Sequence, residues 1–149
     1  MGTRSSIAVK HGDKVKAVYC HWDGYLSHNG YILNKHYNST KANFLVALGA
    51  ISSLGADIGE KHDFDGPKED YPDSLTKTSY TTVTTFYGRD RGEKNTSWKV
   101  YNSVEEWLSE GEEEYNYLMD DGVWYVAYDS RGLVPLHEAL ESLEVEGAE

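Results

Sequence analysis

The chain has 149 residues, a formal net charge of −11 and a single cysteine, Cys20. This length predicts one domain, and a lone cysteine excludes a disulfide bond within the chain. The longest apolar stretch, residues 44–54, is too short to span a bilayer, so we expect a cytoplasmic protein that contacts no membrane.

The negative charge is concentrated in the last third of the chain. Residues 104–149 contain 14 Asp and Glu and one basic residue, Arg131, whereas residues 1–103 carry a small positive excess. Because such a segment repels phosphates, we expect no direct binding to DNA or RNA. The asymmetry favours a partner with a basic surface.

A hairpin is predicted near the start of the chain. Residues 5–9 and 15–22 are rich in β-branched and aromatic side chains, and a His-Gly-Asp turn lies between them. Alternation along the second strand points Cys20 and its neighbour His21 to opposite faces. We expect Trp22 to pack against the helix that begins near residue 41.

Two helices are predicted next. Residues 29–37 form a short one, and residues 41–54 form a longer one with Thr40 or Ser39 as its N-cap and Gly55 at its end. We expect the longer helix to be the central buried helix of the fold. The side chains that follow helical spacing in it are Phe44, Leu45, Leu48 and Ile51.

The middle of the chain is predicted to be irregular. Residues 57–74 follow neither periodicity and are rich in Gly, Pro and charged residues, which indicates a long loop. Residues 78–87 then alternate as a strand, residues 89–95 form a polar turn, and residues 97–101 return as a strand.

The last third begins with a helix and continues as a second hairpin. Ser103 and Glu106 form a capping-box pattern. An Asp-Asp-Gly turn joins strands over residues 114–119 and 123–128, and residues 136–143 form a terminal helix. Together these elements predict an α+β fold, a single compact domain in which three or four helices pack on an antiparallel sheet built from hairpins.

Two motifs near the start resemble those of a known group. They are Thr3-Arg4-Ser5-Ser6-Ile7-Ala8-Val9 and Tyr19-Cys20-His21-Trp22-Asp23-Gly24-Tyr25. Their combination resembles the opening of small phage-encoded accessory proteins of unknown function. The resemblance implies a phage origin and action in the cytoplasm of the infected bacterium, and it implies no particular reaction.

Some residues have the types that catalysis or metal binding needs. Cys20 and His21 have the types of a nucleophile and a base, but their opposite directions favour a buried structural cysteine. Two His/Asp groups would build a metal site only if the long loop folded back on the first hairpin. These groups are His21 with Asp23, and His62 with Asp63 and Asp65. We expect no catalytic group, no metal and no cofactor.

The acidic segment supplies the first functional hypothesis. Its carboxylates would imitate the phosphates of a nucleic acid and occupy a basic cleft on a bacterial host protein. The chain would then be a phage-encoded host-interaction protein that inhibits or redirects a defence or nucleic-acid-handling protein. The residues predicted to bind this partner are Glu110, Glu112, Glu113, Glu114, Asp120 and Asp121.

A small-ligand module is the alternative hypothesis. An arginine would meet phosphate and aromatic rings would stack on a base, so the module would sequester or cleave a nucleotide-like signal. The residues predicted to form this pocket are Arg4, His21, Trp22, Asp23 and Tyr25. The first hypothesis predicts one large acidic patch, and the alternative predicts a concave site lined by these residues.

Overall fold

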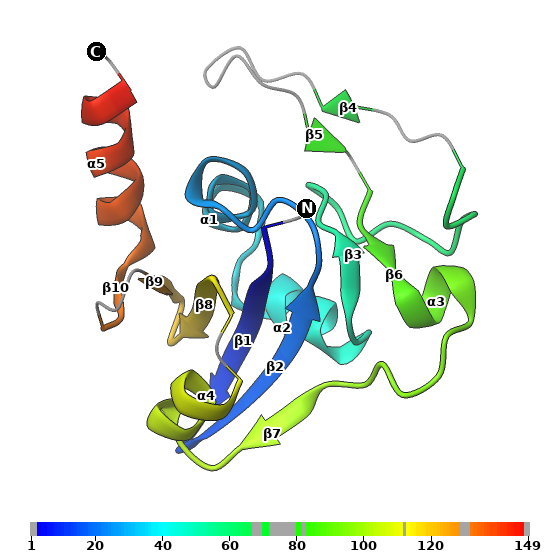
Figure 1. The fold of residues 1–149 in the computed structure, drawn as a ribbon, viewed down its shortest axis with the longest axis horizontal. Coiled ribbons are helices and arrows are strands. Elements are labelled where there is room, and N and C mark those ends of the chain that lie inside the picture. The colour runs from blue at the N-terminus through cyan, green and yellow to red at the C-terminus, as the bar shows by residue number, and fades with distance from the viewer. Residues whose placement is uncertain are drawn as a thin grey trace.

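The computed structural model describes residues 3–66, 70–71, 80–81, 83–111, 113–128 and 132–147. The strands are β1 (Ser5–His11), β2 (Lys14–Cys20), β3 (Ile51–Ser53), β4 (Asp70–Tyr71), β5 (Tyr80–Thr81), β6 (Thr85–Phe86), β7 (Lys99–Tyr101), β8 (Tyr115–Asp120), β9 (Val123–Tyr128) and β10 (Val134–Pro135). The helices are the π-helical turn η1 (Leu26–Gly30), α1 (Tyr31–His36), α2 (Ser39–Ala47), α3 (Tyr87–Arg91), α4 (Val104–Glu110) and α5 (Leu136–Gly147). Eight strands form one sheet in the order β10-β9-β8-β1-β2-β3-β6, with β7 also beside β2 (Figure 1).

The mixed helices and strands were predicted, but the sheet is not purely antiparallel. The two predicted hairpins, β1–β2 and β8–β9, are present, and Gly12, Asp121 and Gly122 take the positive φ values that their tight turns require. However, β1 pairs in parallel with β8, and β2 pairs in parallel with β3. The described residues also form five α-helices rather than three or four. Turn residues reveal hairpins locally, whereas the pairing between hairpins depends on segments far apart in the chain.

Both faces of the sheet are covered. On one face Ile7 and Val18 join the core that α1, α2 and α5 complete, and on the other Ala8 and Ala17 pack against Trp107 of α4. This separation confirms the predicted alternation along the second strand. Helix α4 is short, so it covers only part of its face (Figure 1). No helix in the described part of the chain is long and apolar enough to cross a membrane.

The predicted helix over residues 41–54 is wrong at both ends. Asn38, rather than Ser39 or Thr40, is the N-cap, because its side chain accepts the Lys41 amide at 2.9 Å. The helix ends at Ala47, and Gly49 with φ 92° turns the chain into β3.

The buried side of α2 also differs from the prediction. Phe44 is 65% exposed and Leu48 is 38% exposed, whereas Ala42, Leu45 and Val46 are buried. Ile51, which fitted the helical spacing, is buried in β3 instead. A strand that follows a helix after a short turn can continue the apolar spacing by coincidence, and periodicity alone does not detect the change.

Gly49 leads into a junction that joins three segments. The Ala50 amide donates to the Thr96 carbonyl at 2.7 Å, and the Ala50 carbonyl accepts the Tyr87 amide at 3.2 Å. A Cβ atom at position 49 would lie 2.4 Å from the Thr96 carbonyl oxygen. The end of α2, the start of α3 and the segment before β7 are therefore held at one place.

An ion pair holds the first part of the predicted 57–74 loop. Arg89 donates to the carbonyls of Ile58 and Gly59 at 3.0 and 2.8 Å and to Asp90 at 3.0 Å. The fully buried Asp90 carboxylate also accepts the His62 amide at 3.1 Å. Residues 57–66 of the loop are thus tied to α3, and residues 67–69 and 72–74 lie outside the described part.

The later predicted elements are mixed in outcome. The strand predicted over residues 78–87 is interrupted, since β5 and β6 are short and α3 begins at Tyr87. The polar turn predicted over residues 89–95 therefore begins inside a helix. The strand at β7 and the helix at α5 were predicted. The capping box is also present, with the Ser103 hydroxyl accepting the Glu106 amide at 3.1 Å.

Replacing Gly49 should destabilise the fold. In Gly49→Ala, positive φ is unfavourable for alanine and the new methyl group collides with backbone, so we expect a loss of about 2–4 kcal/mol. Gly12→Ala is the matched control, because Gly12 also has positive φ but a Cβ there meets nothing within 4 Å. Urea unfolding of both variants measures the difference, and equal losses would contradict the role of the Thr96 contact.

The Asp90 carboxylate should make the fold sensitive to acid. Burial by itself raises the pKa of Asp90, but hydrogen bonds from Arg89 and from the Phe86 and His62 amides outweigh it and lower the pKa below its usual value. Protonation is therefore harder in the folded state, and this stabilisation is present above about pH 4 and is lost as the pH falls further. In Asp90→Asn we expect a loss of about 3 kcal/mol at pH 7.

The same variant should lose part of the acid dependence. The free energy of unfolding, measured in urea between pH 2.5 and pH 7, should fall less steeply below about pH 4 in Asp90→Asn than in the wild type. The exposed Glu141→Gln variant is the control and should follow the wild type. Parallel curves for Asp90→Asn and the wild type would show that Asp90 titrates normally.

Candidate functional site

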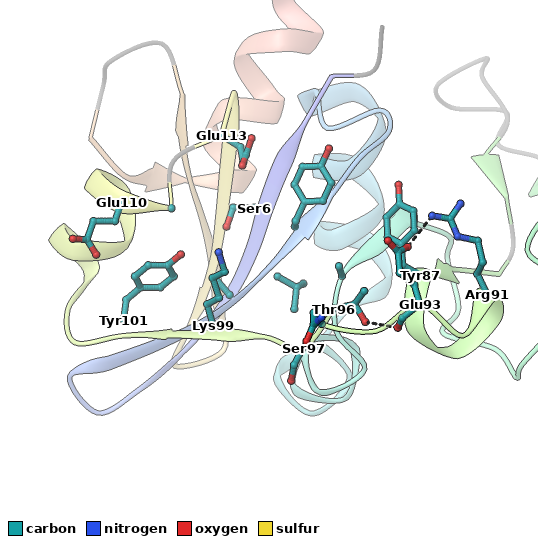
Figure 2. Close-up of a pocket in the computed structure, with 16 residues that line it drawn as sticks. Ser6, Tyr87, Arg91, Glu93, Thr96, Ser97, Lys99, Tyr101, Glu110 and Glu113 are labelled. Carbon is teal, nitrogen blue, oxygen red and sulfur yellow. Dashed lines mark hydrogen bonds and ion pairs between the residues drawn. The ribbon is translucent and has the colours of Figure 1, made fainter.

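A cleft of about 540 Å³ lies on the sheet face that α4 only partly covers (Figure 2). Its floor contains the small side chains of Ser6 and Ala17. Trp107 of α4 reaches Ser6 with an indole N–H that donates to the hydroxyl at 2.9 Å. Beyond this contact α4 ends at Glu110, and the sheet face stays open.

The cleft exists because two strands share one edge of β2. Strand β7 runs beside Val15–Ala17, with Ala17 opposite Lys99, while β3 meets the same edge only at Cys20. Val18 and Tyr19 lie between these two contacts and line the cleft. The separation of β7 from β3 therefore opens the space.

One end of the cleft is acidic. Glu110 and Glu113 line it, on either side of the C-terminus of α4 (Figure 2). The buried Asn116 fixes the backbone of Glu113, since its side chain accepts the Glu113 amide at 2.9 Å and donates to the Glu113 carbonyl at 3.0 Å. Burial raises the pKa of Glu113, the nearby Arg4 opposes this shift and Glu114 adds to it.

Tyrosines stand beside these carboxylates. Burial raises the pKa of Tyr101, and the charges of Glu110, Glu106 and Glu113 raise it further. Burial also raises the pKa of Tyr19, whose hydroxyl lies 2.5 Å from His21 Nδ1. Both phenols therefore stay protonated at neutral pH and offer neutral rings next to negative charge.

The opposite end of the cleft is aromatic with a neutralised cation. Arg91 donates to Glu93 at 2.8 Å, and its guanidinium lies over the rings of Phe64 and Tyr87. Lys99 projects from β7 between the two ends (Figure 2). The cleft thus has one end with uncompensated negative charge and one end with balanced charge.

The structure divides the acidic residues that were predicted to bind a partner. Glu110, Glu113 and Glu114 precede β8, whereas Asp120 and Asp121 follow it. A six-residue strand separates the groups by about 17–20 Å. Asp120 is also within 3.8 Å of Lys10 Nζ. A single patch made of all six residues is therefore not formed, and Glu112 lies outside the described residues.

The residues of the alternative pocket lie beside the cleft, not in it. Trp22, Asp23 and Tyr25 do not line it, and the Tyr25 hydroxyl is directed to Asp23 at 3.4 Å. His21 reaches the cleft only through Tyr19. Arg4 is exposed, yet its charge acts on the lining residues Tyr19 and Glu113.

The expectation that Trp22 packs on the helix is wrong. Trp22 is 43% exposed and its ring contacts the neighbouring His21 ring, with 4.6 Å between centroids. Strand alternation ends at Cys20, because Asp23 has φ 56° and the chain turns out of the sheet. The tryptophan that fills the core is Trp107.

The cysteine and the His/Asp groups do not meet in this cleft. Cys20 is buried as predicted, and burial raises the pKa of its thiol to about 12, so it carries no thiolate at neutral pH. His62 instead lies against Thr85 at 3.1 Å. Among the described residues, no group of three or more His, Cys, Asp or Glu could hold a metal ion.

Sequence reasoning missed most of the cleft. Tyr87, Lys99 and Tyr101 were treated only as parts of strands, because no local motif marks them. The alternation over residues 97–101 does place Lys99 and Tyr101 on one face, and this signal was readable. Nothing local indicated that this face would lie opposite Tyr19.

Comparisons with protein-family models, with curated proteins and with solved structures found no match for this chain.

The two tryptophans should differ in their contribution to stability. Trp107→Ala removes a fully buried side chain and leaves Ser6 without its donor, so we expect a loss of about 3–5 kcal/mol. Trp22→Ala should cost under about 1 kcal/mol, since the side chain is largely at the surface. Thermal and urea unfolding of both variants tests this order, and a larger loss for Trp22→Ala would reverse the assignment of the two side chains.

Proposed function

We propose that this chain is a binding protein that engages a basic segment of a bacterial host protein through the acidic end of the cleft. The observation that carries the proposal is the position of Glu110 and Glu113 in a concave site beside Tyr19 and Tyr101. Carboxylates attract a basic partner over a distance, and tyrosine rings supply rigid contact area once it arrives.

The resemblance of the opening residues to phage accessory proteins supplies the biological setting. A phage protein that covers a basic surface would keep phosphates away from it, and so would inhibit or redirect a defence or nucleic-acid-handling protein. The net charge of −11 supports this role, because it favours encounter with cationic surfaces and disfavours encounter with DNA and RNA.

The chemistry of the cleft favours binding over bond cleavage. The phenols of Tyr19 and Tyr101 have raised pKa values and are poor bases at neutral pH. The thiol of Cys20 is buried with a raised pKa. These groups position and contact a partner more readily than they transfer protons.

A small-ligand module remains the second candidate. It is favoured by the volume of the cleft and by Arg4, whose charge reaches Tyr19 and Glu113. In this role Arg4 and Lys99 would meet an anionic group and the tyrosines would stack on an aromatic one. The site would then be centred on Tyr19, not on Trp22 and Tyr25.

Reversal of the acidic end should slow association with the partner. We expect Glu110→Lys/Glu113→Lys to lower the association rate about tenfold or more at low salt, and the wild-type rate to fall as salt rises. The partner is first captured from bacterial lysate on the wild-type chain, and its association with each variant is then measured by surface plasmon resonance at several salt concentrations.

Glu138→Lys/Glu141→Lys is the matched control, because it makes the same change in net charge on the exposed face of α5. It should alter the rate by less than about threefold. Equal losses in the two double variants would mean that overall charge, and not the acidic end of the cleft, drives association. A rate independent of salt would contradict the charge-led proposal altogether.

A further inference from the structure

The C-terminus of α4 is electrostatically incomplete. Helices are stabilised by cations near their last turn, where backbone carbonyls lack partners and the dipole is negative. Helix α4 has no basic residue in its last turn and ends instead on Glu110, with Glu113 and Glu114 following. The ion pairs formed by the described residues involve other carboxylates than these three. A cation from outside the chain would complete this end.

The space beside this terminus has the walls that suit such a cation. Tyr101 lies directly against the end of α4, because a Cβ atom at Gly111 would come within 2.7 Å of its hydroxyl oxygen. Glu110 and Glu113 line the same cleft, and Tyr19 lines it from β2. Carboxylate oxygens, helix carbonyls and aromatic rings are thus available around one position.

This combination suits a guanidinium better than other groups. A guanidinium is planar, has five N–H donors, is weakly hydrated and stacks on aromatic rings, so it can use two carboxylates, carbonyls and a ring together. An ammonium group is compact and strongly hydrated, and it has fewer donors. An anion would be repelled, and a metal ion would find only two carboxylates among the described lining residues.

We propose that the acidic end of the cleft is a receptor for one arginine side chain, presented by the basic segment of the partner. The inference rests on the proposed function and makes it specific. Glu110 and Glu113 hold the guanidinium, Tyr101 provides the ring it stacks on, and Asn116 acts as a positioning residue by fixing the Glu113 backbone. The partner is therefore selected by an accessible arginine and not by positive charge alone.

The test uses small probes that carry a single charge. N-acetyl-L-arginine methylamide and N-acetyl-L-lysine methylamide are titrated separately into the full chain, and amide shifts are followed by ¹H–¹⁵N NMR. We expect saturable shifts at Gly111, Glu113 and Tyr101, with the arginine probe binding at least about threefold more tightly than the lysine probe. Equal or tighter binding of the lysine probe overturns the proposal.

Three variants assign the contacts. Glu113→Gln should weaken the arginine probe about tenfold, because a charged hydrogen bond is lost. Tyr101→Leu keeps apolar bulk but removes the π face, and it should remove the preference for arginine over lysine. Glu138→Gln removes one carboxylate on α5 and should change binding by less than about twofold. Equal weakening by Glu113→Gln and Glu138→Gln overturns the proposal.

The outcomes separate this inference from the function on which it rests. If the probes leave the cleft unshifted while charge reversal still slows the whole partner, the arginine receptor is rejected and the proposed function stands. If the arginine probe saturates the cleft and Glu113→Gln weakens it, but the captured partner is insensitive to charge reversal, the receptor stands and the proposed function is rejected.

Discussion

The shared edge of β2 is the constraint on which the rest of the structure depends. One side of β2 pairs with β1 along its whole length, and the other side is divided between β7 and β3. The division requires the chain to leave α2 abruptly at Gly49 and Ala50 to bond with Thr96 and Tyr87. A longer α2, as the apolar spacing suggested, would remove β3 and with it one wall of the cleft.

Two polar devices hold that arrangement in place. The Arg89–Asp90 pair ties residues 57–62 to α3 through backbone amides and carbonyls, so the charge of each partner replaces hydrogen bonds that the loop does not make with itself. The Trp107–Ser6 hydrogen bond places α4 on the sheet and determines where the helix stops covering it. The cleft begins at this point.

The acidic composition acquires meaning only through this geometry. Most of the negative charge is solvated, and Asp120 is compensated by Lys10. Glu110 and Glu113 differ because they are partly withdrawn from water beside tyrosines and at a helix end that has no cation of its own. Partial desolvation strengthens the attraction between such carboxylates and an incoming cation, which is why these residues, rather than the whole segment, are proposed to select a partner.

The sequence by itself determined the features that depend on neighbouring residues. Both hairpin turns, the Ser103 capping box, the faces of β2 and the burial of Cys20 follow from local dihedral preferences and alternation. Only the tertiary structure decided the parallel pairings, the end of α2, the exposure of Trp22 and the meeting of Tyr19 with Tyr101 and Glu113. The physical reason is that these depend on contacts between segments tens of residues apart, whose free energy is set by packing and not by any local preference.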